Sequence, residues 1–165
     1  GTLECHHPDG RVEELDVEGT AWFDRQYGDL LFATLNGWRW FSIQLDNDSQ
    51  IMIFDQPAIG RGGEKYGNYS TPGQETVFLG DRDYTLEVLA TWQSQRSERN
   101  YPSRWRLTVL GESYLVVPFL KDQEVNFLGK LDYWEGACEV QDSNGGPVGE
   151  AYVELVDFQN DNIGG

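Results

Sequence analysis

The chain has 165 residues, which is enough for one domain with a hydrophobic core, and 13% of them are aromatic, so a disordered chain is excluded. The formal net charge is −16, and such a surface repels the phosphates of nucleic acids and anionic membranes, so neither is an expected partner. No apolar run approaches the length of a membrane-spanning helix.

Short β-prone runs separated by turn residues follow one another along the chain, and no stretch has a convincing helical period. In chain order, we expect strands at residues 2–6, 11–18, 30–35, 38–45, 51–54, 76–79, 84–92, 104–110, 113–119, 131–141 and 149–158. Hairpin turns are expected at Pro8-Asp9-Gly10, Asn36-Gly37 and Asn144-Gly145-Gly146-Pro147. These eleven runs predict an all-β sandwich or an antiparallel barrel of about nine or ten strands. The many aromatic residues favour a barrel with room for a ligand inside it.

Three segments do not fit the strand pattern. Residues 56–75 form the longest glycine-rich stretch, and Tyr66 and Tyr69 within it predict a lid that closes over a ligand. Residues 93–103 are a second candidate loop at the mouth of the barrel, and residues 120–130 show no clear period. We expect a single domain over the whole chain.

Cysteine and histidine residues offer little chemistry. Cys5 and Cys138 are too few for a disulfide framework, and we expect two free thiols because nothing else points to an oxidising compartment. This slightly favours a cytoplasmic location, although the N-terminus, which shows no signal peptide, does not decide it. His6 and His7 are adjacent on a strand, so their side chains diverge. We therefore predict neither a metal nor a cofactor.

Two glutamates lie in the middle of the two C-terminal strands. Glu135 and Glu154 would be close if these strands form one hairpin. Two carboxylates that share a site raise the pKa of one of them, which would supply a proton donor at neutral pH. The alternative is that each carboxylate is neutralised by an arginine or accepts backbone N–H bonds.

Asp24 and Arg25 form a second charged pair, but adjacent strand residues point to opposite faces. An inward Asp24 could act as a general acid or hold a substrate hydroxyl. The alternative is a structural network in which Asp24 pairs with Arg104 or Arg106 and Arg25 pairs with one of the two glutamates.

Six tryptophans are more than a small closed barrel needs, so we expect some in the core and some stacked on a flat ligand. The predicted substrate-binding residues are Trp22, Trp38, Trp40, Phe54, Tyr69, Trp105, Trp134 and Tyr152.

Five sequence blocks occur in the order Trp22–Gly28 (WFDRQYG), Trp38–Leu45 (WRWFSIQL), Tyr101–Trp105 (YPSRW), Tyr133–Ala137 (YWEGA) and Tyr152–Leu155 (YVEL). Together they resemble the carotenoid 1,2-hydratase (hydroxyneurosporene synthase) family of the lipocalin-like superfamily, which also includes natural-product cyclases such as decalin-forming Diels–Alderases. The resemblance implies a lipocalin-like antiparallel β-barrel. The chain resembles the second of the family's two domains, which implies that it packs against another such domain in a longer protein.

The resemblance also implies a cofactor-independent enzyme that holds a hydrophobic, polyene-type small molecule in its barrel. The leading expectation is a cyclisation such as a [4+2] cycloaddition, which needs a shaped pocket and hydrogen-bond donors but no nucleophile. The residues expected to act as donors, walls or acids are Asp24, Arg25, Tyr27, Trp40, Trp134, Glu135 and Glu154.

Two alternatives remain open from the sequence. The first is a hydratase that adds water to an isoprenoid double bond. Hydratases of the family tend to carry histidine where Arg25 stands, and arginine cannot replace histidine as a proton shuttle, so this departure favours cyclisation. The second is a non-catalytic barrel that binds a hydrophobic ligand or packs against another domain.

Overall fold

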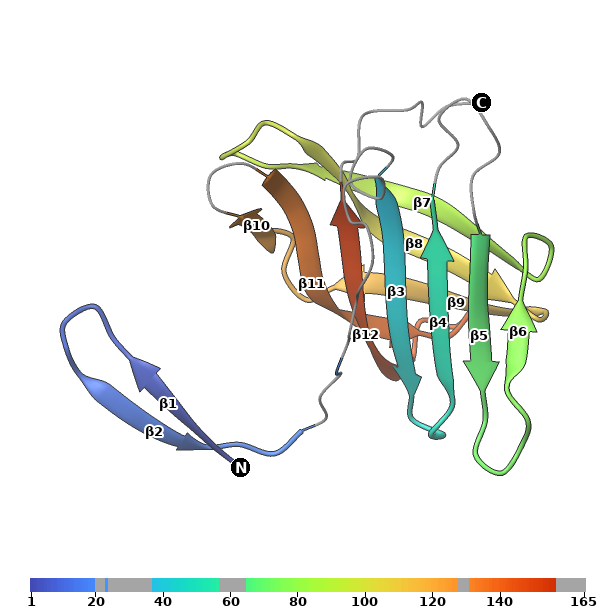
Figure 1. The fold of residues 1–165 in the computed structure, drawn as a ribbon, viewed down its shortest axis with the longest axis horizontal. Helices are drawn as coiled ribbons and strands as arrows, with labels where there is room; N and C mark the ends of the chain where they lie inside the picture. Colours follow the sequence, from blue (N-terminus) through green and yellow to red (C-terminus); the bar gives the residue numbers. More distant parts are fainter. Residues whose placement is uncertain (20–22, 24–36, 57–64, 128–130, 157–165) are drawn as a thin grey trace.

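A computed structural model describes residues 1–19, 23, 37–56, 65–127 and 131–156 (Figure 1). The N-terminal strands are β1 (Thr2–His6), β2 (Val12–Asp16), β3 (Trp38–Leu45), β4 (Gln50–Asp55), β5 (Lys65–Ser70) and β6 (Val77–Leu79). The C-terminal strands are β7 (Tyr84–Gln93), β8 (Asn100–Val109), β9 (Glu112–Pro118), β10 (Glu124–Phe127), β11 (Leu131–Gln141) and β12 (Pro147–Val156). The predicted all-β, lipocalin-like fold is confirmed.

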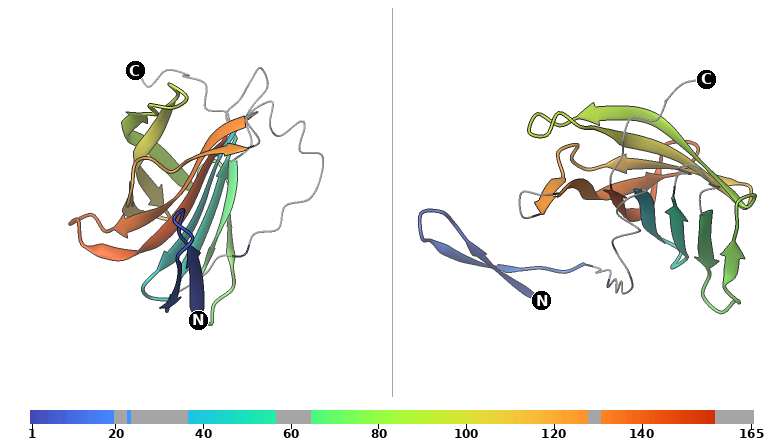
Figure 2. Two further views of the ribbon diagram at one scale, coloured as in Figure 1. Left: turned by 90° about the vertical axis from the view of Figure 1, so that its left-hand side faces the viewer. Right: turned by 45° about the horizontal axis from the view of Figure 1, so that its top comes forward.

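One antiparallel sheet holds ten of the described strands, in the order β6-β5-β4-β3-β12-β11-β9-β8-β7, and β10 pairs with β11 beside this path. The sheet curls into a half-barrel, so that β3 to β6 face β7 to β9 across its interior (Figures 1 and 2). The first and last strands of this sheet, β3 and β12, are neighbours at its centre.

The hairpin turns follow from their residues. Between β11 and β12, the Asp142 carboxylate accepts the backbone N–H groups of Asn144 and Gly146, each at 2.9 Å, and Gly145 takes a φ of 83°. Between β3 and β4, Asp48 takes a φ of 62°, which aspartate tolerates better than most residues. The turn predicted after Gln141 is therefore present, and it aligns β11 with β12.

The interior of the half-barrel is packed with side chains. Phe41 of β3 meets Trp105 of β8 edge to face, with ring centroids 5.4 Å apart, although these strands are not neighbours in the sheet. Trp105 and Trp134 are 0% and 1% exposed, and their rings lie 6.2 Å apart. The expected ligand space inside the barrel is thus occupied by aromatic rings of the core, which the number of tryptophans alone could not distinguish from a pocket wall.

The prediction of three irregular segments is wrong in part, because each contains residues that form a strand. Residues 65–70, within the predicted lid, form β5 and pair with β4 along its whole length, so Tyr66 and Tyr69 belong to the sheet. The loop predicted over residues 93–103 ends at Ser103, but β8 begins at Asn100 and pairs there with Gln93 of β7. Residues 124–127 form β10. In each case, pairing with a partner strand overrides a weak local preference.

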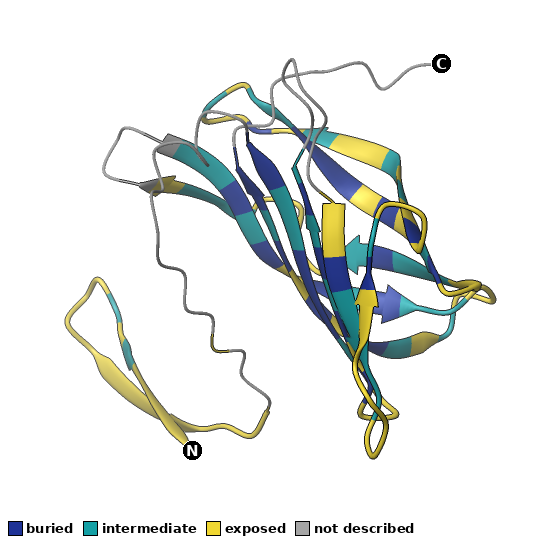
Figure 3. Cartoon of the chain, turned by 45° about the vertical axis from the view of Figure 1, so that its right-hand side comes forward, coloured by how far each residue is buried: buried dark blue, intermediate teal, exposed yellow. Residues whose placement is uncertain are grey.

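The N-terminal hairpin predicted around Pro8-Asp9-Gly10 is confirmed, and it lies apart from the main sheet (Figures 1 and 2). Almost all of its residues are exposed, as the yellow hairpin in Figure 3 shows. Leu3 and Leu15 are cross-strand partners, and they remain 55% and 40% exposed. Because these side chains are exposed and the hairpin lies apart from the main sheet, they add little to the core of the half-barrel. A two-stranded hairpin is also only marginally stable alone.

Both cysteines are free thiols, as expected, but they differ in reactivity. Cys138 is fully buried, and burial raises the pKa of its thiol to about 12, whereas Cys5 is partly exposed on β1. Since the thiolate is the nucleophile, we expect a maleimide reagent at neutral pH to label Cys5 only. Mass spectrometry should find one label on the native chain and two on the unfolded chain, and rapid native labelling of Cys138 would show that β11 opens.

Candidate functional site

The outer face of the sheet carries the polar and aromatic residues that the core does not use. Phe41 points into the interior, so its neighbours Trp40 and Ser42 point outward. A cross-strand row on this outer face runs from β11 to β5 and consists of Glu135, Glu154, Trp40, Phe54 and Tyr66. Phe54 and Tyr66 stack in this row with ring centroids 4.9 Å apart.

Glu135 and Glu154 are directly opposite each other on β11 and β12, so the prediction that one hairpin brings them together is confirmed. Side chains at opposed positions of antiparallel strands have Cβ atoms about 4.5–5.5 Å apart, and like charges there destabilise the sheet. The indole Nε1–H of Trp38 donates to Glu154 Oε2 at 3.2 Å. Glu154 is therefore held by a neutral donor of the same face.

The hydroxyls of Tyr133 and Tyr152 lie near the Glu135 carboxylate. Burial, and then the Glu135 carboxylate, raise the pKa of the Tyr133 hydroxyl, and the same two causes act in this order on Tyr152. Both hydroxyls therefore stay protonated across the physiological range and remain donors. Both hydroxyls can therefore donate a hydrogen bond to the Glu135 carboxylate.

A cavity of about 500 Å³ opens over this part of the outer face. Its lining residues come from β3, β11, β12 and the segment after β9, and they are Trp40, Ser42, Gln44, Phe119, Glu135, Ala137, Glu150, Ala151, Tyr152 and Glu154. A second hollow of about 560 Å³ adjoins it and shares Gln44, Phe119 and Glu150 with it. Volumes of this size accommodate a small-molecule ligand.

The structure separates the predicted site residues into three groups. Those that line the cavity are Trp40, Glu135, Tyr152 and Glu154. Those that flank it on the same outer face are Trp38 and Phe54. Those that point inward are Tyr69, which packs against the core, and the core residues Trp105 and Trp134. Trp22, Asp24, Arg25 and Tyr27 lie outside the described residues.

Sequence reasoning missed several lining residues, although strand alternation could have found two of them. Glu150 is separated by two and four residues from Tyr152 and Glu154, so it lies on the same face of β12. Ser42 shares the outer face of β3 with Trp40. Phe119 follows the end of β9 and carried no such signal, because its position depends on how the chain crosses to β11.

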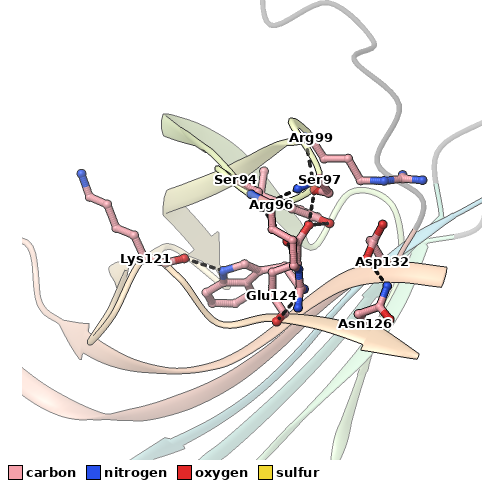
Figure 4. Close-up of polar contacts among 10 residues, drawn as sticks. Ser94, Arg96, Ser97, Arg99, Lys121, Glu124, Asn126 and Asp132 are labelled. Atoms are coloured by element: carbon pink, nitrogen blue, oxygen red, sulfur yellow. Dashed lines mark hydrogen bonds and ion pairs between the residues drawn. The ribbon is translucent and has the colours of Figure 1, made fainter. Parts of the chain in front are cut away.

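A second polar cluster surrounds Glu124, whose side chain is 1% exposed (Figure 4). Its carboxylate accepts hydrogen bonds from Ser94 at 2.6 Å, from Tyr101 at 2.8 Å, from Arg96 Nε at 3.1 Å and from Ser97. Burial opposes ionisation, but these donors outweigh it and lower the pKa of Glu124. All its acceptor positions are used within the protein, so the cluster ties β10 to the β7–β8 turn rather than offering a ligand site.

Other charged groups have structural partners. Arg106 pairs with Glu87 at 2.5 Å on the surface, whereas the predicted partner Asp24 lies outside the described residues. Arg39 pairs with Asp55 at 2.7 Å on the inner face of β3 and β4. Among the described residues, no group of histidine, cysteine or carboxylate side chains could hold a metal ion. The described part of the chain also contains no helix long and apolar enough to span a membrane.

The fold and the outer cavity define a lipocalin-like half-barrel with an acidic, aromatic-walled pocket. The model of the AttH-like family matches residues 1–158, so the chain belongs to the AttH-like family. This agrees with the expected lipocalin-like membership. No curated protein matched the sequence.

Two solved structures share the fold. One is an AttH candidate from Nitrosomonas europaea, with a TM-score of 0.67 and 26% identity over 75% of this chain. The other is kievitone hydratase from Nectria haematococca, with a TM-score of 0.57 and 20% identity over 73% of this chain. The match covers 39% of each of those chains, so this chain corresponds to less than half of either protein.

Proposed function

We propose that the cavity binds a hydrophobic, unsaturated small molecule and adds water across one of its carbon–carbon double bonds. The observation that carries this proposal is the in-register pair Glu135 and Glu154 at the wall of an aromatic-lined cavity. Acid–base catalysis of hydration needs one group that gives a proton and one that takes a proton, and two adjacent carboxyl groups can share these roles. The fold shared with kievitone hydratase supports the same class of reaction.

The proposed reaction balances within the carboxyl pair. The protonated carboxyl group transfers its proton to one alkene carbon, and the π electrons form the new C–H bond. Water attacks the neighbouring cationic carbon and loses a proton to the other carboxylate. The pair then again holds one proton. Tyr133 and Tyr152 orient Glu135 throughout through their hydrogen bonds, and Trp40 supplies an apolar wall.

The test is turnover in water labelled with heavy oxygen, using a panel of lipophilic unsaturated compounds that includes kievitone. We expect one labelled oxygen in the product. Glu135→Gln and Glu154→Gln should each lower the rate about 10²–10⁴-fold, which is the usual contribution of general acid–base catalysis. Glu14→Gln on the exposed N-terminal hairpin removes the same charge outside the cavity and should leave the rate unchanged. Full turnover in both cavity variants would exclude the carboxyl pair as the catalyst.

Cyclisation, including a [4+2] cycloaddition, is the second candidate. It is favoured by the apolar wall that Trp40, Phe119 and Tyr152 form, which could hold a polyene folded. The labelled-water experiment separates the two reactions, because cyclisation leaves the product mass equal to that of the substrate. A product without labelled oxygen would therefore show that the reaction is cyclisation and not hydration.

A non-catalytic role is the third candidate. Phe119 and Leu120 are 54% and 66% exposed beside the cavity, and both solved relatives are longer than this chain, so a further domain could pack here. In that case the isolated chain would turn over none of the compounds in the panel.

A further inference from the structure

A second carboxylate pair lies beside the first on the outer face. Glu139 of β11 is directly opposite Glu150 of β12, four residues along each strand from Glu135 and Glu154. Strand geometry places the two pairs about 13 Å apart. Tyr152 lies between them, opposite Ala137. Tyr152 thus lies between two carboxylate pairs, about 7 Å along the strands from each, on the floor of two adjoining hollows.

An unpartnered hydroxyl group lies in the same cavity. Ser42 is opposite Tyr152 on β3, lines the cavity, and is only 2% exposed. Its Oγ makes no hydrogen bond to any residue that the structure describes. Buried hydroxyl groups in proteins normally have a partner, because leaving one unpaired loses the hydrogen bonds it makes to water. This hydroxyl is therefore available to a bound ligand.

The groups that face this part of the cavity mostly accept hydrogen bonds. Carboxylates accept only, and a serine hydroxyl can accept as well as donate. Glu139 is already fixed by Gln141, whose Nε2 donates to Glu139 Oε1 at 2.5 Å. A ligand that satisfies these acceptors must bring several N–H or O–H donors, and a positive charge would also relieve the repulsion between the paired carboxylates.

We infer that the Glu139–Glu150 end of the cavity binds an organic ammonium group. Ser42 Oγ accepts one of its N–H bonds, Glu150 and Glu139 neutralise its charge, and the Tyr152 ring provides a face for the attached apolar chain. The net charge of −16 attracts such a ligand and repels carboxylates and phosphates. The ligand class is therefore a lipophilic amine.

This inference rests on the proposed function only for the position of the reacting bond. An amine held at Glu139 and Glu150 would place its apolar chain along Tyr152, toward Glu135 and Glu154. Binding of the ammonium group itself needs no turnover. A failure of hydration would consequently leave the amine site intact, and a failure of amine binding would leave the acid–base pair intact.

The experiment compares phenethylamine with its neutral analogue phenethyl alcohol by isothermal titration calorimetry at low ionic strength. We expect the amine to bind at least about tenfold more tightly than the alcohol, which is a modest gain for a charge between several carboxylates. The double variant Glu139→Gln/Glu150→Gln should remove this preference and leave the affinity for the alcohol unchanged. Ser42→Ala should weaken amine binding several-fold, since it removes one acceptor.

A matched control is present on the N-terminal hairpin. Glu4 and Glu14 are also directly opposite each other, but they lie on β1 and β2, outside the cavity. The variant Glu4→Gln/Glu14→Gln changes the net charge equally and should retain the preference for the amine. Equal affinities for amine and alcohol in the unmodified protein, or equal losses in the cavity variant and the control variant, would overturn the inference. Circular dichroism of each variant confirms that the sheet is retained.

Discussion

Replacing Trp105 by alanine is expected to lower the free energy of unfolding by about 3–5 kcal/mol, the usual loss for a large aromatic residue removed from a core. The reason is its position. Trp105 is 0% exposed and contacts Phe41 across the interior and Trp134 beside it, so its removal leaves a cavity between the two sides of the half-barrel. Urea denaturation followed by far-UV circular dichroism measures the loss.

Trp105→Phe is the matched control for this experiment. It retains an aromatic ring against Phe41 and removes the indole Nε1, which is buried without a partner among the described residues. We expect it to cost less than about 1.5 kcal/mol, because loss of the unpartnered N–H offsets part of the lost contact. Similar stabilities for the alanine and phenylalanine variants would contradict the central place of this ring in the core.

Replacing Glu124 by glutamine is expected to lower the free energy of unfolding by about 3–5 kcal/mol, as when one partner of a buried charged network is removed. The glutamine side chain has the same shape, but its amide nitrogen is a donor that faces other donors. Ser94, Tyr101 and Arg96 would lose acceptors in the cluster shown in Figure 4. Urea denaturation at neutral pH gives the difference between the two proteins.

The pH dependence of this difference provides a second readout. Hydrogen bonds lower the pKa of Glu124 in the folded state despite its burial, so the folded pKa lies below the ordinary value of 4.5. Its stabilising contribution is therefore complete above the pKa of the unfolded chain and is lost as the pH falls through the folded pKa. The difference in the free energy of unfolding between the unmodified protein and Glu124→Gln should therefore become smaller below about pH 4.5. Glu112 is exposed, so Glu112→Gln serves as the control. Its free energy of unfolding at neutral pH should stay within about 0.5 kcal/mol of that of the unmodified protein.

Much of the fold could be predicted from local pattern. The β-prone runs at residues 38–45 and 149–158 predicted β3 and β12, and the turn residues after Gln141 fixed the pairing of Glu135 with Glu154. The curvature of the sheet could not be predicted in this way. Alternation divides residues between two faces but does not say which face encloses the core, so the rings of Trp105 and Trp134 were expected around a ligand.

The Glu124 cluster was missed for a related reason. Its donors lie in the turn after β7 and at the start of β8, and they meet Glu124 only because β10 lies beside that turn. The sequence pattern within residues 120–130 does not indicate that Glu124 would bind donors so distant in the sequence. The same limit applies to Phe119, whose role at the cavity depends on the path of the chain between β9 and β11.

The placement of β12 between β3 and β11 has a consequence for how the chain is made. During synthesis, β3 to β6 can form one meander and β7 to β11 another, but the strand that joins them in the sheet, β12, is made after both. Until then, both meanders expose an unpaired backbone edge and one apolar face, a combination that promotes aggregation. Completion of the sheet is a long-range closure and is therefore slow. The acidic hairpin of Glu4 and Glu14, which is made before the sheet, adds negative charge that keeps such intermediates apart.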